Sequence, residues 1–166
     1  MKWKHCSVEL NTAYSPEMAL WFRIVQERWA ATAMDGEGAR LHGGRWNPPG
    51  VPAVYLAESR ALAALEILVH APREVLRLEW RVIPVDVPEE WIEPARALPD
   101  GWRDEPSSLA ARRYGAAWLA KERAVGLAVP SVIVPQERNM LLNPRHPQVA
   151  KLKAGKAERF VFDPRL

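Results

Sequence analysis

Apolar and polar residues alternate along several short segments, and this pattern predicts strands. Residues 76–83 (LRLEWRVI) alternate strictly, which predicts a strand with one buried and one exposed face. Such a strand belongs in an antiparallel sheet that is buried on one side. Further strands are predicted at residues 19–26 (ALWFRIVQ), 51–57 (VPAVYLA) and 129–135 (VPSVIVP), and at the end of the chain, where Phe160 and Phe162 alternate.

Two segments carry the signals of helices. In residues 59–71 (SRALAALEILVHA), Ser59 is suited to the N-cap, Ala and Leu dominate the interior, and Pro72 ends the segment. A second helix is predicted from Ser107 or Ser108 to about residue 124. The chain between these elements is expected to be irregular, at residues 35–50, 84–106 and 136–147.

The order of the predicted elements is strands, a helix, strands, a helix and strands again. This order favours an α+β fold over a doubly wound parallel sheet. The 166 residues suit a single domain spanning residues 1–166, with enough chain to bury a sizeable core. Apolar residues make up 48% of the chain and charged residues 26%, as in ordinary globular proteins.

Charge and targeting signals limit the classes of partner. The net charge is +3 and the basic residues are scattered, so no direct nucleic-acid contact is expected. The first residues lack an apolar core of signal-peptide length, and no run of 18 apolar residues predicts a membrane span. The single Cys6 excludes an internal disulfide. A cytoplasmic protein is therefore predicted.

Glu66 lies within an otherwise apolar stretch of the predicted helix 59–71. Between Ala61 and Ala71 the only polar side chains are Glu66 and His70. Burying a carboxylate is costly, so Glu66 is expected to have hydrogen-bonding partners or a chemical purpose. The alternative is an ordinary Glu66–His70 pair on a partly exposed helix edge.

The glycine-rich segment LHGGRWN places Arg45 directly after two glycines. Backbone N–H groups and a guanidinium in such a loop suit a phosphate, although the loop alone is a weak signal and the alternative is a tight turn with a surface arginine. Tyr55, ten residues later, shares its strand face with Ala53 and Ala57. The small neighbours leave room for a ligand to stack on the ring, although a core tyrosine remains the alternative.

The remaining polar candidates carry weaker signals. Ser131 lies in an apolar segment without a GxSxG motif, so a hydrogen-bonding role is favoured over a nucleophile. The histidines do not have metal-ligand spacing, and no metal site is expected. The four histidines are His5, His42, His70 and His146.

Three segments together resemble the RES-domain family, which is named after an arginine, a glutamate and a serine. They are GARLHGGRWNPPG, VYLAESRALAALEILVH and VPSVIVPQERNMLLNPRHP. The resemblance runs from about Phe22 to Phe162, and the GGRWN segment and its distance to the Tyr and the Glu are the most specific features. His42 departs from the family, where an aromatic residue is expected.

The resemblance implies a fold and an activity. It implies an ADP-ribosyltransferase-like fold, with split, mostly antiparallel sheets around a cleft and a few helices. RES proteins are bacterial toxins, usually encoded beside a helix-turn-helix (Xre-type) antitoxin. Members of the family destroy NAD+ by hydrolysis or phosphorolysis, and at least one ADP-ribosylates a protein. NAD+ is then the substrate, and no prosthetic group is implied.

Residues are carried over by position. Arg45, Tyr55 and Glu66 match the active-site trio, and Ser131 matches the named serine. Arg23 and Asn143 are expected to line the same cleft. The acceptor of the ADP-ribose (water, phosphate or a protein) and self-association stay open.

The residue types suit cleavage of the nicotinamide–ribose bond, whose departure step generates positive charge on the ribose. A carboxylate at Glu66 would stabilise that charge, and Arg45 would pair with the pyrophosphate. Tyr55 would stack on nicotinamide or ribose, and Ser131 would fix an amide or a hydroxyl group. Two readings from other classes are a ribonuclease toxin that uses histidines with Glu66, and a non-enzymatic binding module.

Overall fold

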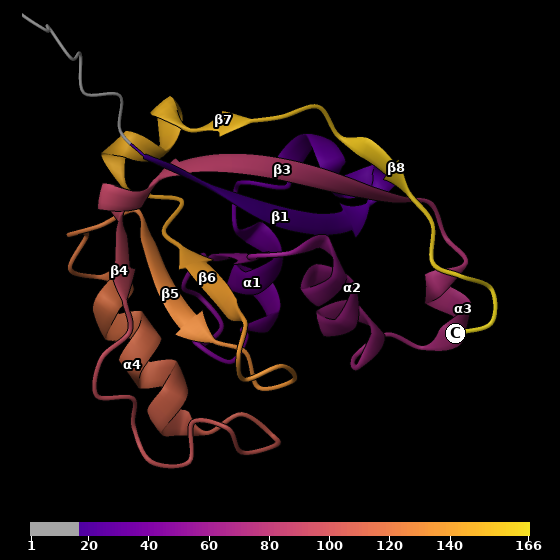
Figure 1. The fold of residues 1–166 in the computed structure, drawn as a ribbon. Coiled ribbons are helices and arrows are strands. Elements are labelled where there is room, and N and C mark those ends of the chain that lie inside the picture. Colours follow the sequence, from indigo (N-terminus) through magenta and orange to yellow (C-terminus); the bar gives the residue numbers. More distant parts are fainter. Residues whose placement is uncertain (1–16) are drawn as a thin grey trace, which may run out of the picture.

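The computed structural model describes residues 17–166, which form one curved sheet with helices on its faces (Figure 1). His5 and Cys6 lie outside the described residues. The strands are β1 (Met18–Gln26), β2 (Val54–Ala57), β3 (Trp80–Pro88), β4 (Ile92–Pro94), β5 (Gly126–Pro130), β6 (Arg138–Leu142), β7 (Lys153–Ala154) and β8 (Glu158–Phe160). The α-helices are α1 (Glu37–His42), α2 (Arg60–Leu68), α3 (Arg73–Leu76) and α4 (Leu109–Leu119). Short 3-10 helices cover Glu27–Thr32, Glu89–Trp91 and Pro147–Lys151.

The strand order is β4-β5-β6-β2-β1-β3-β7, and β8 also pairs with β3. All pairs are antiparallel except β4 with β5. This arrangement confirms the predicted α+β class and the mostly antiparallel sheet. Among the described residues, no helix is long and apolar enough to cross a membrane.

The sheet is split between β1 and β2. These two strands share a single register pair, Phe22 with Ala57, whereas β1 and β3 pair along nine residues, from Met18–Pro88 to Gln26–Trp80. Figure 1 shows the result: β1 and β3 run together across the molecule, and β4, β5 and β6 run at a steep angle to them. The β1–β3 part and the β2–β6–β5–β4 part diverge from the β1–β2 junction, and the cleft lies between them.

The two predicted helices form, and each begins after a serine that caps it, as the sequence predicts. The hydroxyl of Ser59 accepts a hydrogen bond from the Leu62 N–H, and that of Ser108 accepts one from the Ala111 N–H. Helix α2 ends at Leu68, before the predicted residue 71, and α4 ends at Leu119, before residue 124. Helix α2 packs on β1 and β2, beside the junction of the two parts of the sheet.

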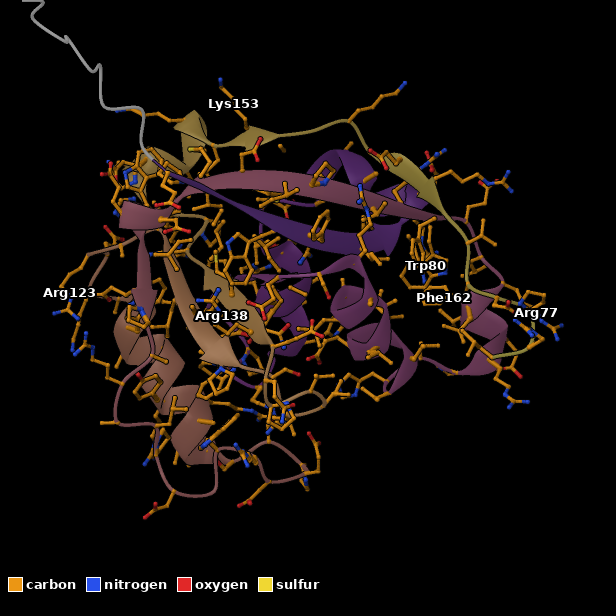
Figure 2. The ribbon with its side chains drawn as sticks, viewed as in Figure 1. Arg77, Trp80, Arg123, Arg138, Lys153 and Phe162 are labelled. Atoms are coloured by element: carbon orange, nitrogen blue, oxygen red, sulfur yellow. The ribbon has the colours of Figure 1, made fainter. Side chains whose placement is uncertain are left out.

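The core has three parts that follow the split. One lies on the face of the sheet that carries Trp21, Val85 and Met140, and a second lies under α2 around Leu62. The third joins α4 to the glycine-rich segment through Trp46 and Trp118. Figure 2 shows Trp80 and Phe162 side by side near one end of the sheet, where their rings pack edge to face with centroids 5.5 Å apart.

Several boundaries differ from the sequence-based predictions. Residues 136–147 contain the central strand β6 and residues 84–106 contain the end of β3 and strand β4, so both segments are more regular than predicted. Residues 35–50 contain helix α1, which begins where the Asp35 side chain accepts a hydrogen bond from the Glu37 N–H. Pairing with neighbouring strands, which a local pattern does not show, stabilises β6.

Two predicted strands are shifted along the chain. Residues 76–83 begin in α3, with Leu76 buried and Leu78 exposed, and strand pairing starts only at Trp80. Strand β5 covers Gly126–Pro130 in place of 129–135, so Ser131 lies directly after a strand and not inside one. In both cases the strand covers the residues whose backbone groups pair with a neighbouring strand, rather than the whole apolar run.

Gly115 on α4 allows the helix to lie against the glycine-rich segment. A Cβ atom added at Gly115 would lie 1.9 Å from the Trp46 carbonyl oxygen. Gly115→Ala is therefore expected to lower the free energy of unfolding by about 3 kcal/mol, measured by chemical denaturation. The matched control is Gly38→Ala on α1, where a Cβ would meet nothing within 4 Å. A Gly115→Ala protein as stable as the control would contradict this packing.

Candidate active site

A cleft of about 850 Å³ opens at the split, which is a volume typical of small-molecule sites. Its walls come from β1, β2, β6, α1, α2 and α4, and from the glycine-rich segment, the segment that precedes α4 and the turn after β5. Polar side chains from distant parts of the sequence meet there, including Arg23, Arg45, Tyr55, Glu66, Arg112 and Asn139. Four of the six residues predicted for the site thus line one cleft.

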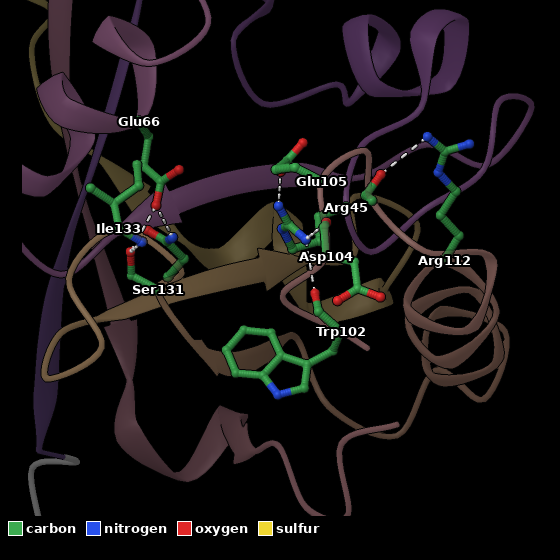
Figure 3. A network of polar contacts seen from close by, with 10 residues as sticks. Arg45, Glu66, Trp102, Asp104, Glu105, Arg112, Ser131 and Ile133 are labelled. Carbon is green, nitrogen blue, oxygen red and sulfur yellow. Dashed lines mark hydrogen bonds and ion pairs between the residues drawn. The ribbon is translucent and has the colours of Figure 1, made fainter. Parts of the chain in front are cut away.

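Glu66 is held by two side chains through one of its oxygens. The Oε1 atom accepts hydrogen bonds from the Ser131 hydroxyl at 3.0 Å and from the Asn139 amide at 2.5 Å (Figure 3). Within residues 17–166, the other oxygen, Oε2, makes no hydrogen bond. The two donors fix the orientation of the carboxylate and leave one oxygen for a ligand in the cleft. The alternative interpretation, an ordinary Glu66–His70 pair on the helix edge, is not observed among the described residues.

Ser131 acts from behind Glu66 and does not itself line the cleft. Its side chain is fully buried, and its Oγ accepts hydrogen bonds from the N–H groups of Ile133 (3.0 Å) and Val134 (3.1 Å). These bonds form because the chain turns directly after β5. The hydroxyl proton therefore points to Glu66, which gives Ser131 the role of a positioning residue.

Removal of the Ser131 hydroxyl leaves the Ile133 and Val134 N–H groups without a partner, and it leaves Asn139 as the one remaining donor to the Glu66 carboxylate. Ser131→Ala is therefore expected to lower the free energy of unfolding by about 2 kcal/mol, as buried groups that lose their partners do. Chemical denaturation measures this change. A Ser131→Ala protein with unchanged stability would contradict the hydrogen-bond network around Glu66.

The glycine-rich segment is anchored by Tyr55. The Tyr55 hydroxyl donates to Asn47 Oδ1 at 2.7 Å and accepts from the Trp46 N–H at 3.0 Å. Gly44 permits this approach, because a Cβ there would lie 2.5 Å from the Tyr55 hydroxyl oxygen. Burial raises the pKa of Tyr55 well above its usual value, so the group stays a neutral donor. The hydroxyl is thus committed to the loop, and only the ring is available to a ligand.

Asn47 completes the anchor of this segment. It is fully buried, and its amide donates to the carbonyl oxygens of Ala39 at 2.9 Å and Val51 at 2.8 Å. Gly43 adopts a φ of +72°, a left-handed conformation that favours glycine. The two glycines of LHGGRWN are therefore required by the turn and by the approach to Tyr55, and they place Arg45 at the cleft.

Arg45 is bound to the segment that precedes α4. Its Nη1 donates to the carbonyl oxygens of Trp102 at 2.8 Å and Asp104 at 2.9 Å, and its Nη2 pairs with the Glu105 carboxylate (Figure 3). The neighbouring Trp46 stacks on Trp102 with ring centroids 5.7 Å apart. The 102–105 segment is thus fastened to the glycine-rich segment at two adjacent residues.

Arg23 bridges the split in the sheet. Its Nη1 donates to the Tyr55 carbonyl oxygen at 2.9 Å, a strand oxygen that faces the gap between β1 and β2. Burial lowers the pKa of Arg23 to about 10, so the guanidinium stays charged at neutral pH. Its Nε atom is buried and has no hydrogen-bond partner within the described part of the chain. Arg23 therefore contributes a partly unsatisfied cation to the cleft.

Asn143 lies away from the residues that line the cleft. Its amide donates to the Leu119 carbonyl oxygen at the end of α4, at 3.0 Å, and its Oδ1 accepts from the Arg145 N–H. The structure brings Asn139, and not Asn143, to Glu66. Asn139 was missed because residues 136–147 were predicted to be irregular. In a strand, the side chain of Asn139 points to the opposite face from its buried neighbour Met140.

Two further cleft residues escaped the sequence-based analysis, Glu105 and Arg112. The first lies in the stretch 84–106, which was predicted to be irregular, and the second lies on a helix that was predicted without any role for its side chains. Of the histidines, His42 and His70 line the cleft, whereas the Nδ1 of His146 accepts a hydrogen bond from the Gln148 N–H. Among the described residues, no three His, Cys, Asp or Glu side chains gather as a metal site.

Known proteins resemble this chain in sequence and fold. A protein named Prs ADP-ribosylating toxin, from Sphingobium sp., is 41% identical over 143 residues, which are 83% of this chain and 89% of that protein. The NAD(+) phosphorylase MbcT of Mycobacterium tuberculosis is 56% identical over 36 residues, 21% of this chain and 19% of that protein.

The fold and the family also match. The toxin in the crystal structure of the M. tuberculosis MbcT–MbcA toxin–antitoxin complex superposes with a TM-score of 0.66 at 20% identity, over 88% of this chain and 86% of that one. The family of proteins described as the RES domain matches residues 20–163, which include every polar side chain of the cleft described above. The chain therefore belongs to the RES domain family.

Proposed function

We propose that this protein is the toxin of a toxin–antitoxin pair and that it cleaves the nicotinamide–ribose bond of NAD+. The observation that carries the proposal is the Glu66 carboxylate, which is fixed through one oxygen and free at the other, in a cleft that also contains Arg45. Relatives named for NAD+ phosphorolysis and for ADP-ribosylation support the same bond as the target.

The reaction needs little proton transfer at the leaving group. The bond between ribose C1′ and the nicotinamide nitrogen breaks, and its electron pair leaves with the nicotinamide as a neutral molecule. Positive charge then develops on the ribose, and the free Oε2 of Glu66 stabilises it electrostatically. The acceptor oxygen forms the new bond to C1′ and loses its proton to solvent.

The other residues orient the substrate and the carboxylate. Arg45 pairs with the pyrophosphate, as guanidinium groups do with phosphate oxygens. The Tyr55 ring contacts nicotinamide or ribose, while its hydroxyl holds the glycine-rich segment. Ser131 positions Glu66 and does not bind an amide or hydroxyl of the substrate, because its oxygen is already engaged. Arg23 adds positive charge at the split.

A second candidate function is transfer of ADP-ribose to a protein side chain. The 41% identity to the Prs ADP-ribosylating toxin favours it, and the groups at the nicotinamide end are the same. The two functions differ only in the acceptor that attacks C1′. NAD+ labelled in its adenine separates them: label retained on a target protein indicates transfer, and label in free ADP-ribose or its phosphate indicates hydrolysis or phosphorolysis.

The proposed partner is an antitoxin. The related fold in the MbcT–MbcA toxin–antitoxin complex supports an antitoxin in general. The Xre-type helix-turn-helix that the family resemblance implies is the finer part of this proposal. NAD+ is available in the cytoplasm, which is the proposed location. Co-expression with the product of the adjacent gene tests the partner: a stable complex that suppresses NAD+ cleavage is the expected result, and independent purification of an uninhibited enzyme contradicts it.

The decisive experiment is incubation of the purified protein with NAD+, with and without inorganic phosphate, while nicotinamide is quantified. Nicotinamide release is the expected result, and its dependence on phosphate distinguishes phosphorolysis from hydrolysis. Folded protein, free of antitoxin, that releases no nicotinamide in either buffer would contradict NAD+ cleavage to a small-molecule acceptor.

A further inference from the structure

A second guanidinium lines the same cleft as Arg45. Arg112 lies in α4, four residues after the N-cap Ser108, and its Nη2 donates to the Ser107 hydroxyl at 3.1 Å. Its Nε atom is buried and has no hydrogen-bond partner within residues 17–166. Arg112 and Ser107 both contribute to the cleft wall. No acidic side chain in the described part of the chain pairs with Arg112, so its charge is available to an anionic ligand.

The two guanidiniums line the same cleft. The charges of Arg45 and Arg112 both oppose the rise that burial causes in the pKa of Tyr55. In Figure 3, Glu66 and Arg112 lie on opposite sides of Arg45. The cleft therefore has a carboxylate on one side and two cations on the other.

An anion already contacts the cationic side. The Glu105 carboxylate pairs with Arg45 and is part of the cleft wall. The Glu105 side chain is 62% exposed, whereas that of Arg45 is 17% exposed. An ion pair with so exposed a partner is weak, so a ligand with more negative charge can displace the carboxylate. Glu105 thus marks the place where the cleft accepts an anion.

We propose that Arg45, Arg112 and Ser107 form a subsite for the two phosphates of a dinucleotide, and that Glu105 competes with the ligand for this subsite. The proposal rests on the proposed function, which supplies the diphosphate. Two phosphate groups carry two negative charges, and the two guanidiniums neutralise them with directed N–H donors. The Ser107 hydroxyl adds a further donor. Glu105 moves away from Arg45 when the ligand binds.

The basic residue Arg112 and the acidic residue Glu105 should have opposite effects on the affinity for a diphosphate. Loss of the Arg112 charge removes charge-assisted hydrogen bonds to phosphate, so the affinity for a diphosphate is expected to fall about tenfold or more. Loss of the Glu105 charge removes the competitor, so the affinity is expected to rise several-fold, with a smaller gain at high salt.

The test is calorimetric titration of the full chain with ADP, which carries the diphosphate and is not cleaved. The variants are Arg112→Gln, Arg112→Lys and Glu105→Gln, and the matched control is Arg113→Gln. Arg113 is the exposed neighbour of Arg112 on α4 and does not line the cleft. Adenosine serves as the ligand without phosphates. We expect Arg112→Gln to weaken ADP binding, Arg112→Lys to weaken it less, and both to leave adenosine binding unchanged.

Three results would overturn the proposal. Arg112→Gln that binds ADP as tightly as Arg113→Gln would exclude Arg112 from the subsite. Equal weakening of ADP and adenosine binding by Arg112→Gln would indicate a damaged cleft. Weaker binding of ADP to Glu105→Gln would mean that Glu105 positions Arg45 and does not compete. Because ADP binding needs no bond cleavage, these results are separate from nicotinamide release, whose absence counts only against the proposed function.

Discussion

Glu66→Gln lowers the rate of nicotinamide release by about 10²-fold or more, on the scale of losing one electrostatic stabiliser. The substitution changes charge with little change in shape. The glutamine carbonyl oxygen can accept the same two hydrogen bonds from Ser131 and Asn139, which places the neutral amide nitrogen where Oε2 faces the cleft. The fold is therefore retained while the stabilising charge is lost.

The measurement is the initial rate at saturating NAD+, with circular dichroism to compare the folds. Glu74→Gln is the matched control, because Glu74 is an exposed residue of α3 that does not line the cleft. A folded Glu66→Gln protein with the activity of this control would eliminate the electrostatic role of Glu66.

Arg45→Ala raises the KM for NAD+ about tenfold or more and lowers kcat as well. A guanidinium that holds the pyrophosphate contributes in both the ground state and the transition state, and its loss removes charge-assisted hydrogen bonds. Steady-state kinetics over a range of NAD+ concentrations measures both constants. An unchanged KM would contradict the contact with pyrophosphate.

Arg45 also holds the 102–105 segment, so its loss has a structural consequence that needs a control. Its Nη1 binds the carbonyl oxygens of Trp102 and Asp104, and these bonds are lost in Arg45→Ala. Trp102→Ala removes the stacking of this segment on Trp46 while leaving Arg45 in place. If Trp102→Ala reproduced the whole kinetic defect, the order of the segment, and not the guanidinium, would account for it.

The site and the strands around it follow from the sequence in different ways. Arg45, Tyr55 and Glu66 were assigned to one site through the family resemblance, because they come from three separate segments of the chain. Their joint position on one cleft wall agrees with that placement, although their roles remain proposals. The strands were harder to predict because pairing, not apolar content, sets their ends. Strand β6 was missed because its regularity depends on pairing with β2 and β5, which flank it along most of its length.

The residues that the sequence did not reveal act through tertiary contacts. Asn139 reaches Glu66 across 73 positions of sequence, and Glu105 reaches Arg45 across 60. Neither belongs to a local motif, so no pattern of spacing marks it. Ser131 was expected to contact substrate, whereas its hydrogen bonds direct it to Glu66. A residue type alone therefore predicted involvement in the site but not the partner.

The single register pair between β1 and β2 has a consequence for how this cleft is inherited and varied. The opening arises where two strands diverge, so its width follows from sheet twist and from the apolar packing on both sides. Substitutions under α2 or behind β6 would thus change substrate fit without touching a polar residue. The preferred acceptor can therefore change through core substitutions alone, while every charged group of the cleft stays the same.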